Sequence, residues 1–388
     1  MAQRQQRVTP VELFFDLVFV YAITQVTLLM SDDPSWDGVG RGLLVLAALW
    51  WAWTGYAWLT NTLEPEEGLV RAGMFAAMAA MLVVALAVPE AFDADGVLFG
   101  VAYLIVRMLQ LWLYALAAKR DPDLLRTARR KLPPATLATA AIVVAGFSDG
   151  RAQVAFWIVA LAVDYLGAWI AHTEDSRVSP AHFAERHDLI VIIALGESIV
   201  AIGIGAAGET LTPSLVAASV LGIVVIAALW WAYFDVYAVG ALRRLAETGG
   251  AARTRLARDY YSYLHLPMIA GIVLFALGLK KTIEHVDDPL ARVPAAALCG
   301  GLALYFLTHV ALRMRLVHLM RRTTSERPGW IGPGRLVAGL ASLALVPVAR
   351  EVPALLALTL VTGVCCALIA WDLIHYREER VRVRAARP

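Results

Sequence analysis

Apolar runs separated by short polar breaks repeat along the whole chain. A helix of about 20 apolar residues crosses the hydrocarbon core of a bilayer, and most of the runs approach that length. The breaks delimit twelve runs, at residues 12–30, 41–60, 72–89, 97–118, 133–147, 152–172, 187–206, 214–238, 260–280, 294–316, 334–349 and 353–376. The pattern therefore predicts an all-α polytopic membrane protein with about twelve transmembrane helices.

Composition agrees with the membrane prediction. Of the 388 residues, 60% are hydrophobic and only 17% are charged, whereas a soluble domain is about half apolar and a quarter charged. Twelve spans leave almost no length for a separate soluble domain. The first run continues from Glu12 to Met30 without a small-residue cleavage site behind it, so we expect a span and not a cleavable signal peptide.

Basic residues gather in every second loop. By alternation, the same side holds Arg4, Arg7 and four basic segments, which are the loops Lys119 to Lys131, Arg243 to Arg258 and Arg321 to Arg335 and the tail after Arg377. Lys280 and Lys281, on the opposite side, are the main exception. The positive-inside rule then places both termini in the cytoplasm.

The two halves of the chain resemble each other. Matched positions run through both halves: Asp16, Ala22 and Gln25 with Asp188, Ala194 and Glu197; Leu49 to Ala52 with Leu229 to Ala232; Tyr103 and Arg107 with Tyr305 and His309; and Ala162 to Tyr165 with Ala370 to Leu373. An even number of helices per half preserves orientation. We therefore predict two parallel six-helix repeats, residues 1–180 and 181–388, the alternative being a chance likeness of apolar helices.

Ionisable residues inside the runs are the candidates for function, because a charge in hydrocarbon costs several kcal/mol unless it is sheltered. Glu197, predicted near the bilayer centre, either locks helices by pairing with Arg107 or His309, or binds and releases a proton or a ligand cation. Arg107 requires an anionic partner, for which Asp164 and Glu197 are candidates. His309 occupies the place of Arg107 in the second half and either packs or titrates.

Other candidate positions have two interpretations each. Asp16 and Gln25 lie on opposite faces of a straight helix, so a break would be needed for them to share a site. Gly196, before Glu197, favours either local unwinding or close helix packing. Trp50 and Trp230, with Trp53 and Tyr233, form either the aromatic wall of a cavity or ordinary core and interfacial packing.

The region before the seventh run contains ligand-type residues in a spacing that matches no known metal motif. These residues are His172, His182, Glu185 and His187, with Glu12 as a further candidate. We therefore expect no metal and no cofactor.

Two stretches resemble the signature segments of the bacterial low temperature requirement protein A (LtrA) family. They are Glu12-Leu-Phe-Phe-Asp-Leu-Val-Phe-Val-Tyr21 and Glu185-Arg-His-Asp-Leu-Ile-Val-Ile-Ile-Ala-Leu-Gly-Glu-Ser198. The resemblance implies a multi-spanning protein of the bacterial inner membrane, named for a growth phenotype in the cold, and marks Glu12, Asp16, Glu185, Gly196 and Glu197 as signature positions. Asp188 stands where we expect the family to carry glycine.

The leading functional hypothesis is a secondary transporter of a small solute, with proton coupling, in which Glu197, Gln25, Arg107 and His309 line a site between the halves. One alternative is an intramembrane enzyme that acts on a lipid or isoprenoid head group through Glu12, Asp16, Glu185 and Glu197. A non-catalytic membrane sensor is the other. The expected partners are the lipid bilayer and a solute or lipid substrate; nucleic acid is not expected, and a homodimer is left open.

Overall fold

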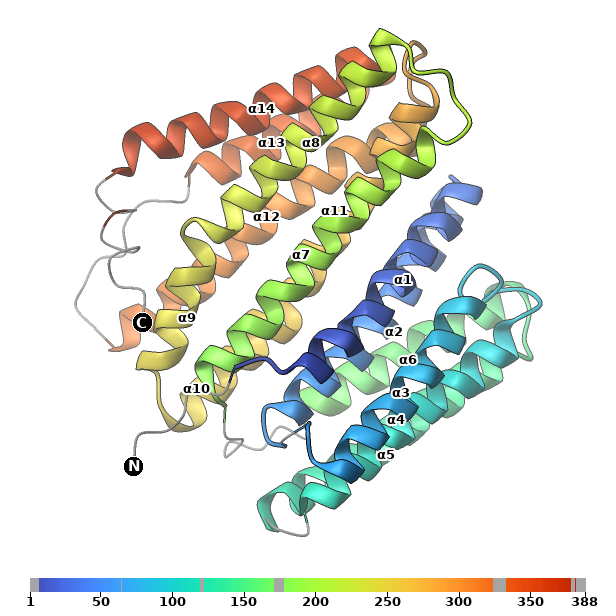
Figure 1. Cartoon of the computed structure of the whole chain (residues 1–388), viewed down its shortest axis with the longest axis vertical. Helices are drawn as coiled ribbons and strands as arrows, with labels where there is room; N and C mark the ends of the chain where they lie inside the picture. Colours follow the sequence, from blue (N-terminus) through green and yellow to red (C-terminus); the bar gives the residue numbers. More distant parts are fainter. Residues whose placement is uncertain are drawn as a thin grey trace. The chain divides into compact units, whose positions relative to one another are not determined.

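A computed structural model of the chain describes residues 7–63, 65–118, 122–170, 178–323, 333–377 and 381. The described residues are helical almost throughout (Figure 1). The first helices are α1 (Pro10–Asp32), α2 (Trp36–Thr60), α3 (Gly68–Ala87), α4 (Gly96–Ala118), α5 (Pro122–Ala145), α6 (Gly150–Ile170) and α7 (Pro180–Gly205). The later helices are α8 (Pro213–Phe234), α9 (Tyr237–Glu247), α10 (Gly250–Leu256), the π-helix η1 (Ala257–Tyr263), α11 (His265–Glu284), α12 (Arg292–Thr323), α13 (Pro333–Val348) and α14 (Ala354–His375).

Each of the twelve apolar runs falls on a helix. In the described part of the chain, ten helical segments are long and apolar enough to cross a membrane, and α13 is a shorter apolar helix. The prediction of an all-α, multi-pass membrane protein is therefore confirmed. The run at residues 133–147 lies on α5, and residues 119–121, which precede α5, fall outside the described residues.

The helices form two compact units. The first contains Met1–Arg186 and Gly249–Arg255, and the second contains His187–Thr248 and Leu256–Pro388. Helix α7 begins in the first unit and continues in the second. Most of α10 belongs to the first unit, in which Arg253 donates to the carbonyl of Val178 at 3.3 Å.

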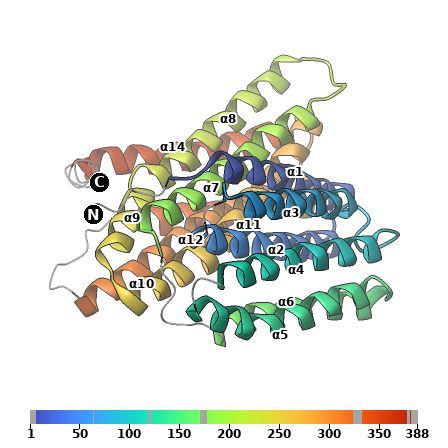
Figure 2. The ribbon, with the colours of Figure 1, turned by 60° about the horizontal axis from the view of Figure 1, so that its bottom comes forward.

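Both units have the same order of neighbouring helices. In the first unit α3 packs on α4, α4 on α5, α5 on α6 and α6 on α2 (Figures 1 and 2). In the second unit α11 packs on α12, α12 on α13, α13 on α14 and α14 on α8. If α11 is matched with α3 and α8 with α2, the two orders agree. The two six-helix repeats, residues 1–180 and 181–388, stay a prediction.

A buried tyrosine makes a similar contact in each unit. Tyr103 of α4 donates to the carbonyl oxygen of Ala48 on α2 at 3.0 Å, and Tyr305 of α12 donates to that of Leu229 on α8 at 2.7 Å. Tyr103 and Tyr305 are matched positions in the predicted repeat. Each hydroxyl satisfies its hydrogen bond on the neighbouring helix, as a buried tyrosine must.

Small residues let two helices of the second unit approach closely. A side chain at Gly271 of α11 would meet the backbone of Gly301 and Tyr305 on α12, and one at Gly301 would meet the backbone of α11. Close approach of backbones through glycine is the usual way to pack helices in lipid, where no hydrophobic force joins them. This crossing fixes α11, whose first residue is His265.

The local structure of α7 and α13 settles two points about the spans. Helix α7 is continuous from Pro180 to Gly205, so of the two interpretations of Gly196 the local unwinding does not apply. The irregular backbone lies instead in η1, directly before His265. Arg335, treated above as part of a basic loop, lies inside α13 with 2% of its surface exposed.

Several of the topology signals fall outside the described residues. Arg4, the residues 324–332 of one basic loop and most of the tail after Arg377 belong to this group. The cytoplasmic position of both termini therefore stays a prediction.

Candidate functional site

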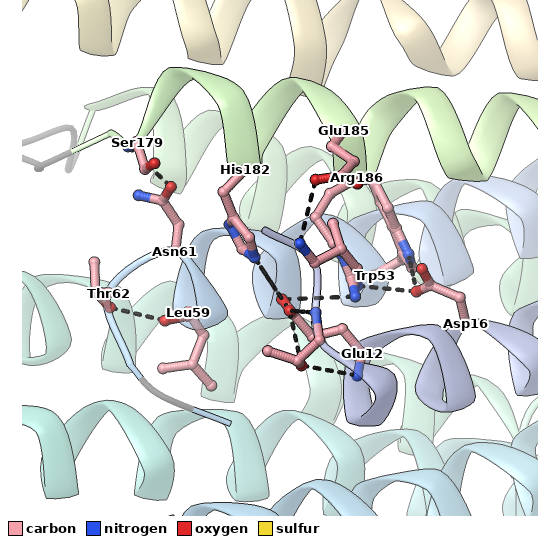
Figure 3. Close-up of polar contacts among 12 residues, drawn as sticks. Glu12, Asp16, Trp53, Leu59, Asn61, Thr62, Ser179, His182, Glu185 and Arg186 are labelled. Atoms are coloured by element: carbon pink, nitrogen blue, oxygen red, sulfur yellow. Dashed lines mark hydrogen bonds and ion pairs between the residues drawn. The ribbon is translucent and has the colours of Figure 1, made fainter. Parts of the chain in front are cut away.

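Five buried side chains of the first unit form a polar cluster at the start of α1 and α7. We call Glu12 and Asp16 of α1, Trp53 of α2, and His182 and Arg186 of α7 the charged cluster (Figure 3). None of the five side chains is more than 2% exposed. Such complete burial of two carboxylates and a guanidinium within membrane-spanning segments requires close pairing.

The start of α1 orients Glu12. Thr9 is the N-cap and Pro10 the first helical residue; the backbone amide of Glu12 donates to the Thr9 hydroxyl at 3.4 Å. In return, Oε2 of Glu12 accepts from the backbone amide of Thr9 at 2.9 Å and from its hydroxyl at 3.0 Å. This reciprocal capping box holds the carboxylate at the helix N-terminus, where the helix dipole also favours negative charge.

Glu12 also contacts two side chains of α7. Nε2 of His182 lies 3.0 Å from Oε1 and 3.1 Å from Oε2 of Glu12. Because a carboxylate only accepts hydrogen bonds, Nε2 carries the proton in this contact. Nη1 of Arg186 lies 3.7 Å from Oε1, within ion-pair distance.

Asp16 lies one helical turn further along α1 and receives two donors. Nη2 of Arg186 and Nε1 of Trp53 each donate to Oδ1 of Asp16 at 2.9 Å. The guanidinium carbon of Arg186 also lies 5.6 Å from the centre of the Trp53 ring, a cation–π distance. Arg186 therefore joins both carboxylates to the aromatic face of α2.

Several polar atoms of the charged cluster make no hydrogen bond within the described part of the chain. Within the described residues no hydrogen-bond partner lies near Nδ1 of His182, Nε and Nη1 of Arg186, or Oδ2 of Asp16. Buried polar atoms are nearly always satisfied by protein, water or ligand. The two donors of Arg186 that lack a partner, next to its fixed positive charge, suit a small polar or anionic molecule.

Two backbone amides next to the charged cluster donate hydrogen bonds to side chains. The amide of Val8 donates to Oε2 of Glu185 at 3.2 Å, and the amide of Ser179 donates to Oδ1 of Asn61 at 3.0 Å (Figure 3). Glu185 itself is exposed. Glu185 therefore holds the segment before α1 through Val8 and is not a member of the buried charged cluster.

Arg107 is paired elsewhere in the first unit. Its Nη2 lies 2.9 Å from both carboxylate oxygens of Asp164 on α6, and its Nη1 donates to Oε1 of Gln110 at 2.9 Å. Of the two carboxylates that the sequence offered, the structure pairs Arg107 with Asp164. The pair joins α4 to α6 inside the unit.

The second unit contains a corresponding pair and a hydrogen-bonded chain. Nη1 of Arg335 lies 2.7 Å from Oδ2 of Asp372, which links α13 to α14. The hydroxyl of Tyr233 on α8 lies 3.0 Å from Oδ1 of Asp188 and 3.0 Å from Nε2 of His265. Asp188 thus accepts a hydrogen bond from Tyr233, although it stands where we expected the family to carry glycine.

The remaining candidates lie at separate places. Glu197 is 1% exposed on α7, and Gln25 is half-buried on the unbroken helix α1. His309 packs its ring against Tyr305 and Tyr237, with centroids 4.4 and 4.8 Å apart. Gln25 and Arg107 belong to the first unit and the other two to the second, so a shared site for the four stays a prediction.

The tryptophan candidates differ in burial. Trp50 is 3% exposed and stacks near Trp53, with ring centroids 5.2 Å apart, whereas Trp230 is 46% exposed. A half-exposed ring on a lipid-crossing helix fits packing against lipid better than the wall of a cavity.

Sequence analysis missed Arg186, Arg335 and the role of Trp53. Arg186 was placed outside the seventh span because the apolar run begins at residue 187, but α7 begins at Pro180. The spacing of His182 and Arg186, four residues apart on one helix face, was the available signal. Among the described residues no group of three or more His, Cys, Asp or Glu side chains is arranged to hold a metal ion.

Comparisons with known proteins give one consistent result. The family model described as "Bacterial low temperature requirement A protein (LtrA)" matches residues 7–370. An uncharacterized protein of Rhizobium meliloti (strain 1021) is 31% identical over 385 residues, a match that covers 95% of this chain and 90% of that protein.

Proposed function

Because the chain belongs to the bacterial low temperature requirement A (LtrA) family of membrane proteins, and crosses the bilayer many times, we propose that it is a secondary carrier of a small anionic solute. The observation that carries the proposal is the charged cluster, in which two donors of Arg186 have no hydrogen-bond partner among the described residues. A guanidinium is the side chain best suited to bind carboxylate or phosphate oxygens inside a protein.

A purely structural role fits the charged cluster less well. An ion-pair network that only locks helices gains most when every donor is used, since each unsatisfied buried donor costs about 1 to 3 kcal/mol. Arg186 leaves Nε and Nη1 without hydrogen-bond partners among the described residues, beside a free Nδ1 on His182. A bound anion would accept hydrogen bonds from these two Arg186 donors.

The same residues offer a route for proton coupling. His182 contacts the carboxylate of Glu12 through Nε2, so a proton can pass between imidazole and carboxylate when the charge of the cluster changes. Ionisable residues inside membrane helices commonly serve such relays. Glu197, Gln25, Arg107 and His309 remain proposed contributors to the solute path.

The first test screens small anions against the purified protein. Acetate, succinate, phosphate and sulfate are added separately, and the melting temperature is compared between the wild type and Arg186→Lys, which keeps the charge and loses the planar fork. At least one anion is expected to raise the melting temperature of the wild type and not that of the variant. Equal responses of the two proteins to every anion would overturn the anion site.

The second test measures transport of the stabilising anion. In proteoliposomes we expect uptake that increases with an inward proton gradient and is lost in His182→Gln. The matched control is His375→Gln, because His375 lies exposed at the end of α14. Binding without uptake would contradict the carrier and leave the anion site intact.

A further inference from the structure

The second unit contains a hydrogen-bonded chain whose protons can be counted. We propose that Asp188, Tyr233 and His265 together hold one proton more than an ionised carboxylate, a neutral tyrosine and a neutral imidazole would carry. The chain is thus a proton-binding site of its own. The inference concerns the second unit alone and does not rest on the proposed carrier function.

The first step fixes one nitrogen of His265. Its Nδ1 lies 2.9 Å from the backbone carbonyl oxygen of Tyr260 in η1. A carbonyl oxygen can only accept, so Nδ1 must carry a hydrogen. In a neutral imidazole the other nitrogen, Nε2, is then an acceptor.

The second step concerns the hydroxyl of Tyr233, which has a single hydrogen. It lies 3.0 Å from Nε2 of His265 and 3.0 Å from Oδ1 of Asp188. If the imidazole is neutral and the carboxylate ionised, both are acceptors, and the single hydrogen can serve only one of them. The hydroxyl oxygen then faces the other acceptor, Nε2 or Oδ1, with no hydrogen between them. Two acceptors at that distance repel each other.

One additional proton removes the conflict in either of two ways. A protonated Asp188 donates to the Tyr233 oxygen, which donates to Nε2 of a neutral His265. Alternatively, an imidazolium His265 donates from Nε2 to the Tyr233 oxygen, which donates to an ionised Asp188. Both arrangements satisfy every contact, and both contain the same number of protons.

Buried aromatic rings lie around the hydrogen-bonded chain. His187 and Tyr261 face the His265 ring with centroids 5.5 and 5.2 Å away, and the ring of Tyr260 lies 5.4 Å away. His309 faces Tyr233 at 6.1 Å. These neighbours are imidazole and phenol rings, all buried. In a low-dielectric setting a continuous hydrogen-bonded chain stabilises the proton that it contains.

Release of the proton has a structural consequence. Without it, either the contact between Asp188 and Tyr233 or that between Tyr233 and His265 must break. The first contact joins α7 to α8, and the second joins α8 to the start of α11. The proton therefore couples the packing of three helices to protonation of the chain.

Infrared spectra and histidine NMR of the protein in lipid at neutral pH test the proposal. The wild type is expected to show either a protonated carboxyl band that disappears in Asp188→Asn, or ¹⁵N signals of a doubly protonated His265, assigned with His265→Gln. Asp16→Asn is the matched control, since Asp16 accepts from Arg186 and Trp53 and should be ionised.

Tyr233→Phe gives a second measurement, because it removes the bridge and keeps the ring. It is expected to reduce the intensity of whichever signature the wild type shows at least about twofold. An ionised Asp188 together with a neutral His265 in the wild type would overturn the proposal. So would a signature that persists unchanged in Tyr233→Phe.

Discussion

Asp16 and Asp188 occupy matched positions in the two halves, yet their surroundings differ in kind. Asp16 accepts from the guanidinium of Arg186 and the indole of Trp53. Asp188 accepts from the hydroxyl of Tyr233, which also contacts His265. The first aspartate lies in a network of fixed charges, and the second lies in a chain that we propose to share a proton.

The difference comes from what the partners can do. An indole N–H only donates and a guanidinium keeps its charge, so both suit an ionised carboxylate. A phenol both donates and accepts, and an imidazole can take up a proton. Trp53 and Tyr233 follow the shared Leu-Trp-Trp-Ala segments at matching positions. A change of one aromatic residue therefore accompanies a change in the chemistry of the aspartate.

Two further buried ion pairs also involve matched aspartates. Asp164 pairs with Arg107 of α4 in the first unit, and Asp372 pairs with Arg335 of α13 in the second. His309 stands where the first unit has Arg107. The aspartate is thus kept in both units while its cation comes from a different helix.

Loss of the guanidinium from the charged cluster should have the largest effect. Arg186→Met leaves Glu12 and Asp16 buried without their cation, and breaking a buried pair in this way costs about 3 to 5 kcal/mol. We expect a strongly lowered melting temperature in detergent. Adding Asp16→Asn to Arg186→Met should recover part of the loss, and an unchanged melting temperature of the single variant would contradict the described contacts.

The aromatic donors should rank next. Trp53→Phe removes a hydrogen bond to a charged group, worth about 1.5 to 3 kcal/mol, whereas Tyr233→Phe removes bonds within a neutral chain, worth about 1 kcal/mol. Equilibrium unfolding of both variants in the same detergent checks the order. A larger loss at Tyr233 would reverse the comparison between the two units.

The capping residue should have the smallest effect. Thr9→Ala removes the N-cap of α1 and one donor to Glu12, at a cost of about 1 kcal/mol. Thr212→Ala is the matched control, because Thr212 caps α8 before Pro213 but has Leu215 where Thr9 has Glu12. We expect the greater loss of stability at Thr9, and an equal loss would show that the capping box adds nothing to the charged cluster.

The fold followed from the sequence more fully than the site did. Apolar length alone predicts the spans, since lipid admits only segments that satisfy their own backbone. The same criterion hid Arg186 and Arg335, because a charged residue at the end of an apolar run reads as part of a loop. Both lie inside helices, where specific partners compensate their burial.

The sequence also could not predict which side chains of distant helices pair with each other. Glu12 and Asp16 were visible as ionisable residues, but their partners lie about 170 positions away on α7. Only the packing of α1 against its neighbours decides that His182 contacts one carboxylate and Arg186 the other. The matched positions did identify Asp16 and Asp188 as equivalent, although not that their environments differ.

Parallel unfolding of Asp16→Asn and Asp188→Asn tests the contrast between the two aspartates most directly. Asparagine at position 16 leaves Arg186 with one carboxylate fewer, and we predict a loss of about 3 kcal/mol or more. Asparagine at position 188 can donate to Tyr233 as a protonated carboxyl would, so we predict a loss below about 1 kcal/mol. Equal losses, or a larger loss at Asp188, would contradict the account.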